Sequence, residues 1–598
     1  MPFRIAKGIV IAALVLVVVR VLMVVISKAF TEQEKVIRSD WTVDAGELLA
    51  EDDVNRVGVY ASGVESDLEV YRILPDDISD DGFTYYDVDV QERLASVVEA
   101  LGSDADGTSW TLESPLAILN PYGTGSNGLY LRFGTDSPTR VSYTVETEGC
   151  SDFSAEASDG LASEHEIQLI GLVPGADNHV TLVATDEAGG TQTLEFDISM
   201  PKTDSGYTTQ LSYEDGASTA ELSDGLYAML RTNGYLGYCF MFDNDGTMRY
   251  EMVTEGLGPD RILNHDGEII ICASASKIAR IDALGRVVAV YDLGDYVLHH
   301  DINEVDDSTI MATVEESGSE LVEDKVIEID LDTGEIAMLV DFSEFLADYR
   351  EGFTSPITAL DAFYWQAGEW DWIHINTVQY VDSDDSLIVS SRETSTIIKV
   401  GSVHTDPHVE WLCGDPAFWE GTPYEGLSLD PVGDFKFQYG QHTVEYAGAG
   451  EEDGVYYLRM FDNNYYKACT REGYDPDLPG GTSTIQTDLL DMFRSYVYVY
   501  MIDENEGTFE LVQSFDVPYS SLVSGAEPDD VWESYHVDCQ DWEYSMDGRN
   551  WVVNSGESKV FGEYDADGEL IREFSYKATL QGYRTVKYSF EGFWFAEE

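Results

Sequence analysis

The fold is decided by a pattern that occurs three times, as HDINEV (residues 300–305), HINTVQY (residues 374–380) and HTVEY (residues 442–446). Each copy starts with a histidine and continues with residues that are common in strands. A turn and a second strand-like run follow in each case, at residues 308–314, 386–391 and 454–461. Repeats of this length, with several strands in each unit, are typical of a β-propeller.

The repeat also predicts where the histidines lie. Residues 201–598 are long enough for about six blades at this spacing, and a weaker fourth copy at residues 536–538 leads to a strand-like run at residues 551–553. In a propeller the innermost strand of each blade lines the central channel. The three histidines are therefore expected to converge near one mouth of that channel. One such histidine would more often be a packing residue, but three at matching positions favour a functional site.

A second β-rich region precedes the propeller. Strand-like runs separated by Gly, Asp or Asn lie at residues 129–133, 141–145, 166–172, 179–185 and 193–198. They predict a small β-sandwich over residues 111–200, so the fold class is all-β. Residues 31–110 are expected to form an acidic membrane-proximal segment with one short helix near residues 91–101.

The N-terminal residues 1–30 predict export. Arg4 and Lys7 precede an apolar run at residues 9–26 that only Arg20 interrupts. This run is just long enough to span a bilayer as an anchor, with the bulk of the chain outside. A cleavable signal peptide is the alternative, because Ser27-x-Ala29 offers small residues at a cleavage site. Both alternatives predict an extracytoplasmic protein, membrane-anchored or secreted.

Composition excludes several classes of protein. The net charge is −80, with 113 acidic against 33 basic residues, so nucleic acid is not an expected partner. No EF-hand loop is present, and none of the six cysteines forms a Cys-x-x-Cys pair. We therefore expect neither a metal nor a cofactor, and an acidic surface that preserves solubility.

Residues around the repeated histidines carry a family resemblance. The stretches are DWIHIN (residues 371–376), SSR (residues 390–392), CGDP (residues 413–416), FQYGQH (residues 437–442) and, upstream, NPYG (residues 120–123). In them the chain resembles the bacterial aryl-sulfate sulfotransferases, which need no nucleotide sulfate donor. The likeness extends from Pro115 to near the C-terminus, and its specific parts are His-x-Asn with Ser-Ser-Arg and the run Gln-Tyr-Gly-Gln-His.

The resemblance implies a six-bladed propeller with a central active site and a ping-pong reaction through a sulfohistidine. His442 matches the nucleophile of the family. The residues that surround the sulfuryl group match His300, His374, Asn376 and Arg392. His299 adjoins His300 and is the alternative ligand, although the repeat favours His300. Some members carry a disulfide shortly before the nucleophile, but only Cys413 lies in that stretch here.

The chemistry of sulfuryl transfer suits these residue types. Three peripheral oxygens carry charge while the nucleophile and the leaving group lie in line. The fork of Arg392 suits two of these oxygens and the amide of Asn376 the third, the alternative for Arg392 being a buried ion pair. His442 must attack as a neutral imidazole, and His374 or His300 can give the departing phenoxide a proton. The aromatic residues Trp372, Phe437 and Tyr439 are expected either to form an aryl wall or to pack within blades.

Two other functions compete with transfer from an aryl sulfate to a phenol. One is an aryl sulfate hydrolase, although no cysteine stands in the Cys-x-Pro-x-Arg context of sulfatases. The other is a non-catalytic binding propeller at the cell surface, because the fold alone decides no function. No Gly-Lys-Ser/Thr phosphate loop for a nucleotide donor occurs. The expected partners are an aryl sulfate, a phenol and the membrane through the N-terminal segment. The sequence leaves the oligomeric state open, a homodimer being one alternative.

Overall fold

The computed structural model describes residues 46–594, with gaps at residues 79, 81, 104–109, 158–159, 204, 233–235, 257, 260, 352–369, 464–494, 518–537, 540–549, 557–558, 577–582 and 591–592. The predicted anchor or signal segment and the histidine of the fourth repeat copy lie outside the described residues. Among the helices that the structure does describe, none combines the length and apolar character needed to cross a membrane.

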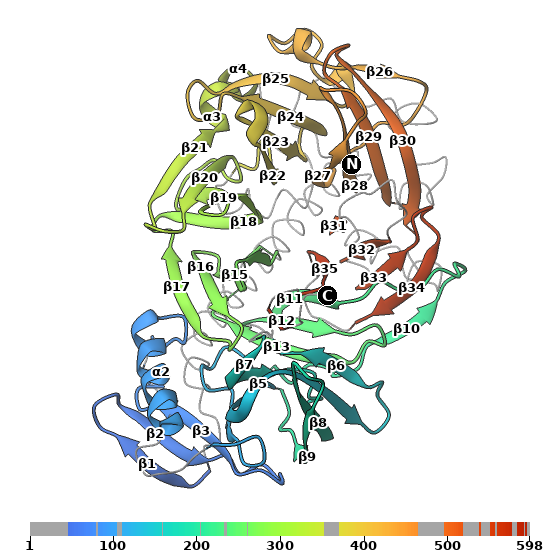
Figure 1. Ribbon diagram of the computed structural model, residues 1–598. Helices are drawn as coiled ribbons and strands as arrows, with labels where there is room; N and C mark the ends of the chain where they lie inside the picture. Colours follow the sequence, from blue (N-terminus) through green and yellow to red (C-terminus); the bar gives the residue numbers. More distant parts are fainter. Residues whose placement is uncertain are drawn as a thin grey trace, which may run out of the picture.

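Six sheets form a ring, which confirms the predicted six-bladed propeller (Figure 1). Counted outward from the centre of the ring, blade 1 contains β35 (Thr585–Tyr588), β11 (Leu226–Thr232), β12 (Gly237–Phe242) and β13 (Met248–Thr254). Blade 2 contains β14 (Leu263–His265), β15 (Glu268–Ser274), β16 (Lys277–Asp282) and β17 (Val287–Asp292). Blade 3 contains β18 (Tyr296–Asp306), β19 (Thr309–Glu316), β20 (Lys325–Asp330) and β21 (Ile336–Asp341).

The other three blades follow the same order of strands. Blade 4 contains β22 (Ile375–Val381), β23 (Ser386–Ser391), β24 (Thr396–Gly401) and β25 (His408–Cys413). Blade 5 contains β27 (His442–Ala449), β28 (Val455–Asp462), β29 (Ser495–Asp503), β30 (Thr508–Val517) and β26 (Asp430–Val432). Blade 6 contains β31 (Asp538–Cys539), β32 (Trp551–Ser555), β33 (Val560–Tyr564), β34 (Leu570–Ser575) and β10 (Ser212–Asp215). Short helices, α3 (Phe342–Phe345) and α4 (Ala347–Glu351), follow blade 3.

Two blades close the ring by combining strands from both ends of the propeller sequence. β35 pairs with β11 in blade 1, and β10 pairs with β34 in blade 6. At this seam the ammonium of Lys587 lies 2.9 Å from the carboxylate of Glu563, and both side chains are fully buried. Loss of either partner of a buried ion pair is destabilising, so this contact helps to hold the two ends of the propeller sequence together.

The predicted N-terminal β-sandwich is built around one long strand, β5 (Leu129–Thr147). One half of β5 pairs with β4 and β7, and the other half pairs with β6 and β8. The remaining strands extend the same sheet at both edges. Their bounds are β1 (Leu48–Asp52), β2 (Val57–Ala61), β3 (Val70–Pro75), β4 (Leu116–Leu119), β6 (Phe153–Glu156), β7 (Ala162–Leu169), β8 (Asp177–Asp186) and β9 (Thr191–Ser199).

Residues 46–103 contain more structure than the sequence predicted. The expected helix is present as α2 (Val88–Gly102), and Asp87 caps it by accepting hydrogen bonds from the first-turn backbone. The apolar face of α2, which includes Leu94 and Val98, is buried against the neighbouring elements. The strands β1, β2 and β3 in the acidic segment were not predicted, and they join the sandwich sheet through β4.

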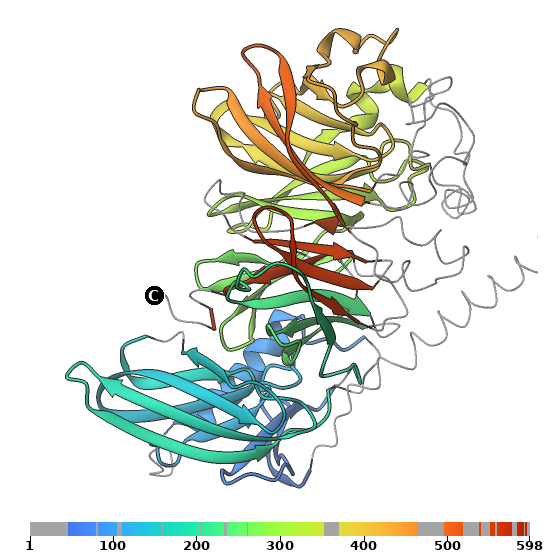
Figure 2. The same cartoon turned by 90° about the vertical axis from the view of Figure 1, so that its right-hand side faces the viewer.

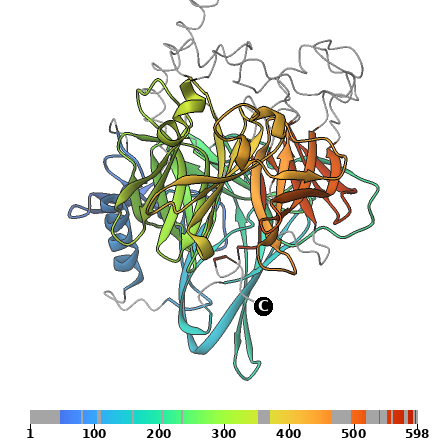
Figure 3. The ribbon, with the colours of Figure 1, turned by 90° about the horizontal axis from the view of Figure 1, so that it is seen from above.

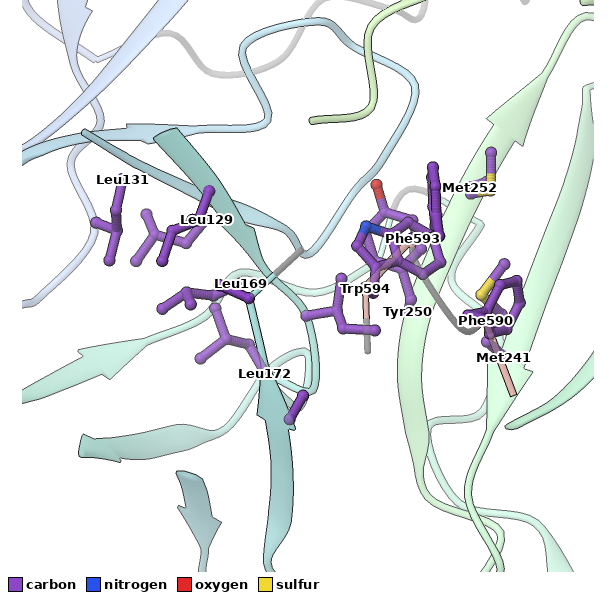
Figure 4. Packing of buried hydrophobic residues seen from close by; sticks show 14 of the residues in the cluster. Leu129, Leu131, Leu169, Leu172, Met241, Tyr250, Met252, Phe590, Phe593 and Trp594 are labelled. Atoms are coloured by element: carbon purple, nitrogen blue, oxygen red, sulfur yellow. The ribbon is translucent and has the colours of Figure 1, made fainter. Parts of the chain in front are cut away.

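The sandwich packs on the edge of the propeller beside blade 1 (Figures 1 and 2). Its long strands, cyan and teal, project away from the propeller disc in Figure 3. Figure 4 shows one continuous apolar cluster that connects the two domains, with the leucines of the sandwich next to Tyr250 and Met252 of β13 and to Phe593 and Trp594 near the C-terminus. Because apolar burial stabilises both parts at once, the sandwich anchors the blade at which the ring closes.

Candidate active site

The structure brings the three repeated histidines together at the inner strands of blades 3, 4 and 5. His300 lies within β18, His374 directly precedes β22, and His442 is the first residue of β27. The ring centres of His300 and His374 are 4.5 Å apart, those of His374 and His442 5.5 Å, and those of His300 and His442 5.9 Å. The three imidazoles therefore form one cluster, as the repeat predicted.

The backbone is strained at this cluster. His300 and His374 have left-handed backbone conformations, with φ of 52° and 53°, and in blade 5 the left-handed residue is Thr443, with φ of 54°. Residues with a Cβ rarely adopt this conformation, and such strain is concentrated at functional sites. In blade 5 the left-handed residue follows the histidine, so His442 is not backbone-equivalent to the other two, although the sequence aligned all three.

Hydrogen bonds between blades fix the inner strands that carry the histidines. Asp301 Oδ2 accepts from the backbone N–H of Val378 at 3.1 Å, and Thr377 Oγ1 accepts from the backbone N–H of Val444 at 3.1 Å. Each of these buried side chains connects its own strand to the next blade. The rings on neighbouring strands are therefore held at fixed separations.

His442 is bound through Nδ1 to uncharged acceptors. Nδ1 lies 3.2 Å from the carbonyl oxygen of Gly440 and 2.8 Å from Oδ1 of Asn463. A backbone carbonyl can only accept a hydrogen bond, so Nδ1 carries a proton, and in the neutral ring the lone pair is then on Nε2. The side chain is fully buried. This tautomer is the one in which Nε2 can act as a nucleophile.

His374 is bound through Nδ1 to carboxylates instead. Nδ1 donates to Oδ2 of Asp371 at 2.6 Å and is in ion-pair contact with Oε2 of Glu323. Burial and the nearby charge of Arg392 both lower the pKa of His374, but Asp371 and Glu323 outweigh them and raise it to about 9. Its Nε2 is buried and has no hydrogen-bond partner among the described residues. His374 therefore presents a charged N–H group to the cluster at neutral pH.

His300 stays neutral beside this cation. Burial, and then the positive charge of His374, lower the pKa of His300 well below its ordinary value. Its Nδ1 lies 2.9 Å from Nδ1 of His299. Among the described ring contacts, His300 touches both His374 and His442, whereas His299 touches only His300. His300 therefore faces the cluster, and a direct role of His299 in binding substrate remains a prediction.

Arg392 is engaged in a buried ion-pair network. Its Nη2 donates to Asp371 at 2.8 Å, and its Nε and Nη2 donate to Oε1 of Glu393 at 2.9 and 2.6 Å. This is the buried ion pair that the sequence left open as the alternative for Arg392. Its charge is offset locally by two carboxylates. A role in holding two substrate oxygens remains a prediction, and it would depend on Nη1.

Asn376 connects blades 4 and 5 beside His442. Its Nδ2 donates to the carbonyl oxygen of Gln441 at 2.9 Å, and its Oδ1 accepts from the hydroxyl of Thr377 at 3.1 Å. The amide thereby holds the residue that precedes His442. Donation from Asn376 to a substrate oxygen remains a prediction.

Four residues of this cluster were not predicted from the sequence as site residues: Asp371, Glu323, Asn463 and Tyr583. The ring of Tyr583 lies 5.2 Å from that of His300 and 6.0 Å from that of His442. Asp371 could have been predicted, because it stands three residues before His374 in the stretch DWIHIN that carries the family resemblance. Glu323 lies between β19 and β20, far from any motif, and only the fold brings it to His374.

The expected aromatic wall is not formed by Trp372 or Phe437. Trp372 is fully buried and donates through Nε1 to Asp324 at 3.0 Å. Phe437 packs against Phe435 and Phe509 with ring centres 5.5 and 6.2 Å apart. Both residues therefore belong to the packing of the blades, the alternative that the sequence left open.

Two groups of side chains at this site have a composition that could hold a metal ion. They are His300, His374 and His442, and Glu323, Asp371 and His374, and within each group the ligand-type atoms lie within 4.8 Å of one another. In the second group His374 already contacts both carboxylates, and Arg392 also forms an ion pair with Asp371. A cation would have to compete with these charges. The expectation that no metal or cofactor takes part remains a prediction.

Residues 213–584 match the family described as Arylsulfotransferase (ASST), and residues 116–201 match the Arylsulfotransferase Ig-like domain. The first match covers more than half of the chain. The chain belongs to the arylsulfotransferase family.

The individual relatives are distant. The Arylsulfate sulfotransferase AssT of Escherichia coli O6:H1 (strain CFT073) is 28% identical in an alignment of 162 residues that covers 24% of this chain and 23% of that protein. The Arylsulfate sulfotransferase AssT of Lelliottia amnigena is 26% identical in an alignment of 251 residues that covers 39% of this chain and 33% of that protein. The matched part thus spans about a quarter to a third of the length of these curated relatives. The WD40 domain of Toxoplasma gondii coronin is 10% identical with a TM-score of 0.29, covering 61% of this chain and 76% of that one.

Proposed function

We propose that this protein transfers a sulfuryl group from an aryl sulfate to a phenol by a ping-pong reaction through a sulfohistidine at His442. The observation that carries the proposal is the opposite setting of two adjacent imidazoles. His442 donates through Nδ1 to a carbonyl and an amide oxygen, which leaves the lone pair on Nε2. His374 lies beside it as a cation with a buried N–H group. The family and the two curated relatives called Arylsulfate sulfotransferase support the same activity.

The first half-reaction uses both imidazoles. Nε2 of His442 attacks sulfur, the N–S bond forms, and the S–O bond to the aryl group breaks. The departing phenoxide takes the proton from Nε2 of His374, a form of general acid catalysis that typically contributes ~10²–10⁴-fold. A phenol then enters, returns its proton to His374, and its oxygen attacks sulfur while the N–S bond breaks. The sulfuryl group and the proton are both accounted for without an added reagent.

A transfer assay tests the proposal against its two competitors. A chromogenic aryl sulfate is supplied to the purified full chain with and without a phenol. We expect colour release to accelerate strongly when the phenol is present and an aryl sulfate ester of that phenol to form. Release that does not depend on the phenol would indicate an aryl sulfate hydrolase, and no release would indicate a binding propeller.

An extracytoplasmic location belongs to the same proposal. The apolar run at residues 9–26 behind Arg4 and Lys7 supports an exported chain that is anchored or secreted. Fractionation of cells that express the full chain tests this, with recovery in the cytoplasmic fraction as the contradicting result. Light scattering of the purified protein tests whether it forms a homodimer, and a monomer mass would exclude this.

A further inference from the structure

Glu323 is a buried carboxylate whose ion-pair partners are histidines. It is 5% exposed, its Oε2 is in contact with Nδ1 of His374, and the same oxygen lies 4.0 Å from Nδ1 of His300. No Lys or Arg pairs with it in the part of the chain that the structure describes, whereas its neighbour Asp324 has the ammonium of Lys325 at 2.8 Å. A charged carboxylate that is buried without a counter-charge is strongly destabilising. His374 and His300 are therefore the basic groups placed to balance a charge on Glu323, and His374 is the nearer one.

The backbone holds Glu323 at this position. Glu323 has a left-handed conformation, with φ of 57°, which residues with a side chain adopt rarely. Its carbonyl oxygen accepts from the N–H of Ile375 at 2.9 Å, and the carbonyl oxygen of Glu320 accepts from the N–H of Trp370 at 2.7 Å. These backbone hydrogen bonds join the connection between β19 and β20 to the segment that carries His374. Strain at a fixed, buried acidic residue is typical of a functional position.

The charges around His374 favour an added proton. The carboxylates of Asp371 and Glu323 contact its Nδ1, Arg392 pairs with Asp371 and Glu393, and the rings of His300 and His442 face it from the neighbouring blades. Asp371, Glu323 and Glu393 thus place three carboxylates around His374 and Arg392, and only two of them, Asp371 and Glu393, contact the guanidinium. Protonation of His374 reduces this excess of negative charge, while the guanidinium is already offset by the carboxylates that it contacts.

We propose that Glu323 is a positioning residue that, together with Asp371, holds His374 as the cation facing the sulfuryl group, while Arg392 stabilises Asp371. The inference rests on the proposed function and adds to it the identity of the group that supplies the charge. The carboxylates keep the proton on Nδ1, and the proton on Nε2 is the one given to the leaving phenoxide and recovered from the acceptor phenol. Glu323 itself contacts neither substrate.

The test compares two donors in the first half-reaction. Phenyl sulfate releases a strongly basic phenoxide and needs the proton, whereas 4-nitrophenyl sulfate releases a weakly basic one and needs it much less. We expect Glu323→Gln to slow release from phenyl sulfate by about 10- to 100-fold and release from 4-nitrophenyl sulfate by less than about threefold, a split that loss of general acid catalysis predicts. The matched control is Glu320→Gln, an exposed residue of the same connection, which should leave both rates unchanged.

A purely structural role would not move the ratio of the two rates. Equal slowing with both donors, or no slowing with either, would overturn the inference while the transfer activity of the unaltered protein still stands. Failure of the unaltered protein to transfer a sulfuryl group would instead refute the proposed function. If Glu323→Gln does not fold, as judged by thermal unfolding, Glu323→Asp provides the measurement and should shift the ratio of the two rates in the same direction by a smaller factor.

Discussion

The surroundings of His442 and His374 differ in the charge of the groups that contact Nδ1 of each ring. At His442 the acceptors of Nδ1 are a backbone carbonyl and a side-chain amide, whereas at His374 they are two carboxylates. Both histidines are buried and only 5.5 Å apart between ring centres. Neutral acceptors fix a tautomer, while charged acceptors fix a protonation state. The same residue type can therefore serve as nucleophile and as acid in one cluster. Different surroundings push the pKa values of two titratable groups apart and so give them different roles.

The strongest test of this comparison removes the imidazole that we propose as the nucleophile. His442→Ala should abolish transfer, a loss of about four orders of magnitude or more in kcat, because no other route forms the covalent intermediate. The measurement is phenol-dependent colour release from an aryl sulfate. His408→Ala, at an exposed histidine, is the control and should retain full activity. Substantial turnover by His442→Ala would move the nucleophile elsewhere.

A change of pH tests the other member of the pair. The raised pKa of His374, about 9, means that the imidazolium is present at neutral pH and is lost as the pH rises through that value. Release of phenoxide from phenyl sulfate should therefore fall by about tenfold per pH unit above 9 until the contribution of the acid is gone. Measuring only the first half-reaction avoids ionisation of the acceptor phenol. A rate that stays flat or rises up to pH 10 would contradict the assignment.

Exchanging the side-chain acceptor at His442 tests whether its lack of charge matters. Asn463→Asp would place a carboxylate where the amide now lies and would favour the protonated, non-nucleophilic imidazole. We expect about a tenfold or greater loss of kcat at pH 7, with recovery as the pH is raised. Asn463→Ala should also lower kcat, about 10- to 100-fold, but without that recovery. Identical pH profiles for the two variants would show that charge at this position is unimportant.

The smallest expected effect comes from the acidic surface. The chain carries a net charge of −80, which repels an anionic sulfate ester until salt screens it, with a Debye length of about 8 Å at physiological ionic strength. We expect the KM for the donor to rise a few-fold when the ionic strength is lowered, while kcat changes little. A KM that is unchanged or lower in low salt would refute this.

The architecture could be predicted from the sequence because the strand pattern is local and repeats. The runs at residues 386–391 and 454–461 became β23 and β28, and the helix near residues 91–101 became α2. The strands at residues 48–75 could not be found in this way. They lie in an acidic, turn-rich segment, and β1 exposes Leu48 and Leu49 instead of alternating between a buried and an exposed face.

The site was predictable only where its residues repeat. The spacing of His300, His374 and His442 predicted their convergence, whereas the contact between Glu323 and His374 depends on how blade 3 meets blade 4. The position of Arg392 illustrates a weaker signal: Glu393 follows it directly in the sequence, and that adjacent carboxylate is one of its partners. Sequence position alone does not distinguish a guanidinium that is available to bind substrate from one that already forms an ion pair within the protein.

A sulfuryl group that is bound to the imidazole of His442 between the two half-reactions can be observed directly. The full chain is mixed with an aryl sulfate in the absence of a phenol, quenched rapidly under alkaline conditions, digested, and analysed by mass spectrometry. We predict a burst of about one phenol per chain and a peptide whose mass increases by one sulfuryl group at His442. A sulfuryl group on another residue, or a burst with no modified peptide, would contradict the account.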